Sequence, residues 1–139
     1  MNQVGAIIFP MKYILYVFYL EIAANLFLIV QCLFFPATFA AQFSSQPAPA
    51  LAVELARWYG VLLIPIVWLL FRVLRTRGAA LKLVLEAYLA FDLIQIVVVF
   101  VTANALGWAP YVIMALWIEI ILATARIVCL WKPAETGID

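Results

Sequence analysis

The chain has 139 residues, of which 70% are hydrophobic and 11% are charged, and its formal net charge is +1 at pH 7. This composition lies far outside that of soluble domains, and the length suffices for one domain. The sequence therefore predicts a single all-α integral membrane domain over residues 1–139. It holds no long run of Lys and Arg, so we expect no nucleic-acid partner, because phosphate binding needs clustered cations.

Four apolar stretches predict four membrane-spanning helices arranged as a bundle. Each is long enough to cross the hydrocarbon core, and they cover about residues 13–35, 55–74, 81–106 and 109–131. The first stretch ends before Pro36, and the Ser- and Pro-containing residues 37–53 are typical of a connector. A cleaved signal peptide is an alternative for the first stretch, but the stretch exceeds the length of a signal-peptide core and contains Glu21.

Basic residues indicate how the bundle is oriented. Half of the chain's Lys and Arg residues surround Gly78 in the short turn between the second and third spans: Arg72, Arg75, Arg77 and Lys82. The positive-inside rule places such a turn in the cytoplasm. With an even number of spans, both termini are then expected in the cytoplasm as well, in a multi-pass protein of the inner (cytoplasmic) membrane.

A polar stripe runs along the third predicted span. Its members are spaced 4, 3, 4 and 3 residues apart, which places them on one face of a helix: Tyr88, Asp92, Gln95, Val99 and Thr102. A charged residue near the bilayer centre costs at least about 2.5 to 3.5 kcal/mol on insertion scales. We therefore expect this face to turn toward the other helices.

Three carboxyl groups are expected at similar depths in the membrane. At about 1.5 Å per residue from the inner end of each span, Glu21 lies about 12 Å deep, Asp92 about 15 Å and Glu119 about 18 Å. With neighbouring polar residues they form a predicted intramembrane pocket, a candidate site for a ligand or for proton transfer: Glu21, Asn25, Trp68, Tyr88, Asp92, Gln95 and Glu119. No residue among them is assigned a catalytic role.

The same depth count separates these acids from the basic residues. Arg72, Glu86 and Arg126 fall closer to the inner end, which predicts ion pairs at the inner rim. No cation is then expected at the depth of Asp92, so this carboxyl is predicted to be neutral and to donate a hydrogen bond. Three readings of the pocket stay open: neutral acids that join helices, a site for a lipophilic ligand such as a quinone, sterol or lipid, and a proton- or cation-coupled path.

The sequence offers few ligands for a metal or redox cofactor. It contains no His, and its two Cys residues, Cys32 and Cys129, are expected near opposite membrane faces, too far apart for a disulfide. Nucleotide-binding glycine loops and nucleophile motifs are absent from the sequence. We expect no metal site and no cofactor held by this chain, apart from a bound lipid or quinone.

One part of the sequence resembles a known family. Residues 55–60 read Leu-Ala-Arg-Trp-Tyr-Gly, and an apolar span, a basic turn, a third helix with Asp92 and a late Arg126 follow. This layout, over about residues 55–131, resembles small bacterial four-helix membrane proteins of the DoxX-like kind. The resemblance implies the four-helix fold and, through some members, an association with quinone-linked redox systems.

Very little of the chain is expected outside the bilayer. The sequence therefore favours a non-catalytic integral membrane protein, an accessory or structural subunit of a larger membrane complex that also binds lipid or quinone. Its expected partners are the lipid bilayer and either other integral membrane subunits or further copies of itself. The alternative is a stand-alone small membrane enzyme or proton-coupled carrier that acts on a lipophilic substrate through the mid-membrane carboxyl groups.

Overall fold

The computed structural model describes residues 14–43, 48–108 and 110–131, and the described chain is almost entirely α-helical. Four of its helices are long and apolar enough to cross a membrane: α1 (Ile14–Phe34), α3 (Ala50–Thr76), α4 (Gly78–Leu106) and α5 (Pro110–Trp131). A short helix, α2 (Pro36–Ala41), lies between α1 and α3. The predicted all-α architecture, with four helices long and apolar enough to span a membrane, is confirmed.

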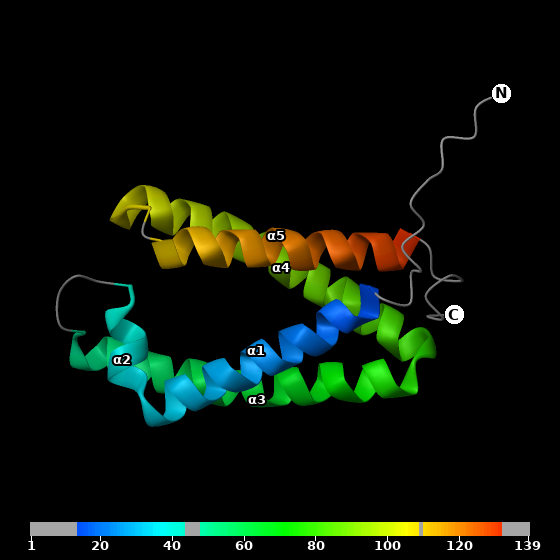
Figure 1. Ribbon diagram of the computed structural model, residues 1–139, viewed down its shortest axis with the longest axis horizontal. Helices are drawn as coiled ribbons and strands as arrows, with labels where there is room; N and C mark the ends of the chain where they lie inside the picture. The colour runs from blue at the N-terminus through cyan, green and yellow to red at the C-terminus, as the bar shows by residue number, and fades with distance from the viewer. Residues whose placement is uncertain (1–13, 44–47, 109, 132–139) are drawn as a thin grey trace.

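The four long helices form two pairs that are joined into one bundle. Helix α1 packs on α3 and α4 packs on α5, while contacts of α3 with α4 and of α1 with α5 connect the pairs (Figure 1). The start of α1, the end of α5 and the turn between α3 and α4 lie at one end of the bundle (Figure 1). We call this the basic end, because Arg75 in the last turn of α3 and Arg77 directly after this helix lie there. The opposite end carries α2 and the turn between α4 and α5; Lys12 and Lys132 lie outside the described residues.

The turn between α3 and α4 is tight. Arg77, which follows the last residue of α3, has φ 61°, and Gly78, the first residue of α4, has φ 67°. Gly78 adopts a positive φ without steric cost. At Arg77 the same sign of φ is strained, because its Cβ crowds the backbone. The turn reverses the chain within two residues and brings α4 back along α3.

The predicted connector over residues 37–53 is partly wrong, because it contains helical structure. Pro36 occupies the start of α2, where a missing N–H is tolerated, and Phe39 from this helix is buried against Cys32 and Ala56. Helix α3 begins at Ala50, directly after Pro49, rather than at Leu55. The polar and proline-rich composition masked two short helical segments that tertiary packing stabilises.

Close contact between α1 and α3 depends on Gly60. A Cβ atom added at this position would lie 2.7 Å from the Cβ of Cys32 and 3.3 Å from side-chain atoms of Leu33. Small residues allow such close helix approach in membranes, where dispersion contacts supply much of the association energy. Gly60 is therefore the point that sets the spacing of this helix pair.

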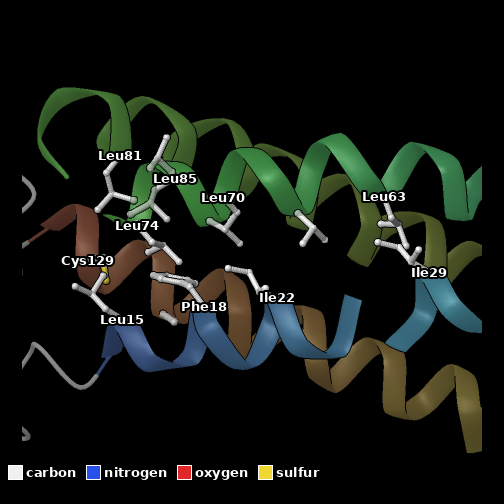
Figure 2. Close-up of a cluster of buried hydrophobic side chains, with 13 residues drawn as sticks. Leu15, Phe18, Ile22, Ile29, Leu63, Leu70, Leu74, Leu81, Leu85 and Cys129 are labelled. Atoms are coloured by element: carbon white, nitrogen blue, oxygen red, sulfur yellow. The ribbon is translucent and has the colours of Figure 1, made fainter. Parts of the chain in front are cut away.

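The apolar core lies toward the basic end and draws on all four long helices. Figure 2 shows Phe18 of α1 among Leu70 and Leu74 of α3, Leu85 of α4 and Cys129 of α5. Cys32 belongs to a separate cluster with Phe39 and Ala56. Both cysteines are free, which confirms the prediction that they do not form a disulfide with each other.

Candidate functional site

Arg126 of α5 is the centre of a buried ion cluster. Its side chain is fully buried, and Nη2 donates hydrogen bonds to Oε1 and Oε2 of Glu21 at 2.7 and 2.6 Å. Nη1 donates a hydrogen bond to Oδ2 of Asp92. Only 8% of the Glu21 side chain and 3% of the Asp92 side chain are exposed. One guanidinium thus joins α5 to α1 and to α4.

Two aromatic rings enclose the same guanidinium. Its central carbon lies 5.4 Å from the ring centre of Phe18 and 5.2 Å from that of Tyr88, within the range of cation–π attraction. The Tyr88 hydroxyl donates a hydrogen bond of 2.6 Å to the backbone carbonyl of Ile66 in α3. The cluster therefore connects all four membrane-spanning helices. Among the buried side-chain polar atoms that the structure describes, Nε of Arg126 is the one without a hydrogen-bond partner.

The directions of the helices explain why these residues meet. A Cα–Cβ bond tilts toward the N-terminus of its helix. Helices α1 and α4 start at the basic end, so Glu21 and Asp92 lean toward that end, whereas α5 finishes there and Arg126 leans away from it. The charged groups of Glu21, Asp92 and Arg126 therefore meet, although their Cα atoms lie at different depths in the bundle.

Two sequence-based predictions are wrong at this point. Asp92 does have a basic neighbour, and it accepts a hydrogen bond from Arg126 rather than acting as an isolated neutral donor. Arg126 does not belong to an inner-rim set, because its partners are Glu21 and Asp92 instead of Glu86. Glu86 and Arg72 are exposed and form no ion pair within the described ranges, and the Arg72 guanidinium lies 5.9 Å from the Trp68 ring centre.

A cavity of about 630 Å³ adjoins the ion cluster and extends between the helices. On α4 its lining runs from Ala87 to Thr102, about 22 Å along the helix axis at 1.5 Å per residue. The whole polar stripe of α4 lines it, in agreement with the expected inward orientation: Tyr88, Asp92, Gln95, Val99 and Thr102. Apolar side chains form most of the remaining wall.

The structure brings together all but one of the residues assigned to the intramembrane pocket. Those that line the cavity are Glu21, Asn25, Tyr88, Asp92, Gln95 and Glu119. Trp68 does not join them: it is 62% exposed and borders a separate apolar groove of about 410 Å³ between α1 and α3. The buried stripe of α3 includes Leu63, Val67 and Leu70, and Trp68 lies beside that stripe rather than on it.

Charge in the cavity is unbalanced. Glu119 is half-buried, lies close enough to Glu21, Asp92 and Arg126 for their charges to interact, and makes no hydrogen bond within the part of the chain that the structure describes. Three carboxyl groups thus share one guanidinium. An uncompensated charge is costly away from water, so protons or a further cation must offset the excess negative charge.

An aromatic group lines the cavity near the opposite end, and sequence reasoning missed it as part of the site. Phe43 and Tyr111 meet edge to face with ring centres 4.8 Å apart, and Phe39 stacks on Tyr59 at 6.3 Å. Phe39 and Phe43 also contact each other at 5.3 Å. Their i, i+4 spacing within the supposed connector was the available signal, because it places two rings on one helical face.

The comparisons with family models, with curated proteins and with solved structures gave no match to this chain. The resemblance to DoxX-like proteins therefore stays a prediction from the sequence. No grouping of three or more Asp, Glu, Cys or His residues suited to a metal ion occurs among the described residues. The cavity, with carboxyl and amide groups in an otherwise apolar wall, is the candidate site.

Proposed function

We propose that this protein is a non-catalytic integral membrane protein that holds a lipophilic molecule, of the class of a lipid or quinone, in the cavity between its helices. The observation that carries the proposal is a cavity of about 630 Å³ whose wall is mostly apolar, with a few polar groups that can orient a bound molecule. Volumes of about 300 to 1,000 Å³ are usual for small-molecule sites. A ligand dissolved in the bilayer reaches such a site without crossing water.

A binding role fits the chemistry of the polar groups better than a catalytic one. In the described residues, the hydrogen bonds of the site join Arg126 to two carboxylates and Tyr88 to a backbone carbonyl. These bonds pair no nucleophile with a base, which is the arrangement that covalent catalysis requires. The groups hold helices together and present a polar surface to the cavity.

A pair of neighbouring alanines allows the proposal to be tested. Ala24 lines the cavity, whereas the adjacent Ala23 is exposed and does not line it. In Ala24→Phe the added ring occupies cavity volume, and Ala23→Phe places the same ring on the outer surface. After purification in mild detergent, extraction and mass spectrometry should find a bound lipophile with the wild type and with Ala23→Phe, and markedly less with Ala24→Phe. Equal amounts in all three proteins would overturn the proposal.

The excess of carboxyl groups favours a second function, a proton- or cation-coupled carrier. Glu119 faces the cavity without a protein partner in the described chain, and a carboxyl in that position can exchange a proton for another cation. Glu119→Gln keeps the shape of the side chain but cannot release a proton. If the protein is a carrier, proteoliposomes with the wild type should show ligand-dependent proton movement, and those with Glu119→Gln should show none.

The orientation and the assembly state belong to the same proposal. The basic turn around Gly78 supports a cytoplasmic location for the basic end and hence for both chain ends, in the inner membrane. A reporter active only outside the cytoplasm, fused after Asp139, should be silent. Membership of a larger complex predicts that a stoichiometric integral membrane partner accompanies the protein through the purification; homo-oligomers alone would contradict it.

A further inference from the structure

We infer that the lipophilic molecule held in this cavity is a cation, an organic ammonium or phosphonium compound with an apolar body such as a cationic lipid, and not a quinone. This inference rests on the proposed function, because it specifies the ligand class of the same cavity. Its support comes from the charge of the cavity, from the position of Glu119 and from the aromatic wall.

The charge of the site selects against anions. Arg126 is the positive group of the cluster, and both of its Nη atoms already donate hydrogen bonds to carboxylates. It is fully buried and is not part of the cavity wall. An anionic head group would therefore meet the carboxyl groups of Glu21, Asp92 and Glu119 and no free guanidinium. A cation meets a wall that contains three carboxyl groups, with one buried guanidinium behind it, which is the complementary arrangement.

Glu119 is the carboxyl group available to a ligand. Glu21 and Asp92 are engaged by Arg126, whereas Glu119 is half-buried, lines the cavity and has no hydrogen-bond partner among the described residues. On α5 it lies eight residues after Tyr111, which separates the two Cα atoms by about 12 Å along the helix axis. Tyr59 of α3 is close enough to Glu119 for electrostatic interaction.

The aromatic group supplies the second element that a cation requires. Tyr59, Tyr111, Phe39 and Phe43 come from three helices and the segment after α2, and all four line the cavity. Faces of aromatic rings attract cations, and organic ammonium ions are commonly bound between several such rings. The four aromatic side chains and Glu119 line the same cavity, while the apolar wall accommodates the body of the ligand.

Tetraphenylphosphonium and tetraphenylborate provide a matched pair of probes, since they have similar shape and opposite charge. Their binding to the purified full-length protein in lipid nanodiscs can be measured by equilibrium dialysis, with empty nanodiscs subtracted. Glu119→Gln removes the charge at the cavity, and Glu86→Gln removes a carboxyl group from an exposed position on α4. Ala24→Phe and Ala23→Phe report whether the probe occupies the cavity at all.

We expect the phosphonium to bind more tightly than the borate, with affinity reduced about tenfold or more by Glu119→Gln and by Ala24→Phe but unchanged by Glu86→Gln and Ala23→Phe. If both ions bind equally and only Ala24→Phe weakens them, the cavity accepts lipophiles without charge selection; the inference fails and the proposed function stands. If neither ion binds and Ala24→Phe leaves the extracted lipophiles unchanged, both fail.

Discussion

Replacement of Arg126 should be among the most destabilising single changes in this protein. Arg126→Met retains an unbranched apolar stem but removes the guanidinium, so Glu21 and Asp92 lose their shared cation. At an effective dielectric constant of 20, two unit charges 4 Å apart attract with about 4 kcal/mol, and Arg126 holds two such partners. Desolvation offsets much of this attraction, and loss of one member from a buried ion pair typically costs about 3 to 5 kcal/mol. We expect a loss in that range.

The assay is the free energy of unfolding, followed by circular dichroism as SDS is added to protein in mild detergent. Arg57→Met is the matched control, because Arg57 pairs with Glu54 on the surface and the two side chains are 50% and 56% exposed. An exposed pair of this kind contributes at most about 1 kcal/mol. Arg126→Met should therefore destabilise the protein several times more than Arg57→Met.

A triple variant separates loss of the cation from loss of packing. In Arg126→Met with Glu21→Gln and Asp92→Asn, no charge of the cluster remains, and amides can bond to each other. Replacement of a whole buried ion set by neutral groups is often nearly neutral in stability. The triple variant should recover most of the loss. Equal stability of Arg126→Met and Arg57→Met, or a triple variant no more stable than Arg126→Met, would refute the charge-based account of the cluster.

Three further predictions concern local packing. Gly60→Ala should lower the free energy of unfolding by about 1 to 3 kcal/mol, because the new methyl group meets the Cβ of Cys32; the same SDS titration of the double variant with Cys32→Gly should show partial recovery. Tyr88→Phe should cost about 0.5 to 1.5 kcal/mol in that titration by removing the hydrogen bond to Ile66, and no loss would show that the bond is unimportant. Arg77→Gly should raise the detergent melting temperature by relieving a positive φ, whereas an unchanged or lower value would contradict strain at this residue.

Sequence reasoning predicted the helices well because hydropathy and helix-ending residues are local signals. The apolar stretches, Pro36, Gly78 and Pro110 locate the long helices within a few residues of their observed ends. The residues through which the helices pack on one another are harder to predict from the sequence. In a membrane helix both the lipid-facing and the protein-facing residues are apolar, so hydrophobicity does not identify the inner face. Trp68 was assigned to the pocket for this reason, although it faces outward.

The ion cluster was missed because depth was counted at Cα atoms. That count placed Arg126 several ångströms nearer the basic end than Glu21 and Asp92. Arg has a long side chain, and on α5 it leans away from the basic end, while the two acids on α1 and α4 lean toward it. A depth estimate that includes helix direction would have brought the three residues together. The polar stripe on α4 was predictable because Asp and Gln stand out against an apolar background.

Helix direction also explains why Glu119 does not pair with Arg126, although both residues lie on α5. It lies on α5 with Arg126, seven residues earlier, so the two Cα atoms are about 10 Å apart along the axis. The Cα–Cβ bonds of both residues tilt toward the start of α5. Arg126 therefore extends toward Glu21 and Asp92, whereas Glu119 extends away from them, toward the end of α5 that carries Tyr111. Arg126 thus forms ion pairs with Glu21 and Asp92, and these pairs join α5 to α1 and α4. The third acid, Glu119, lines the same cavity as the aromatic rings and has no hydrogen-bond partner among the described residues, which is why the proposed cationic ligand is expected to contact it.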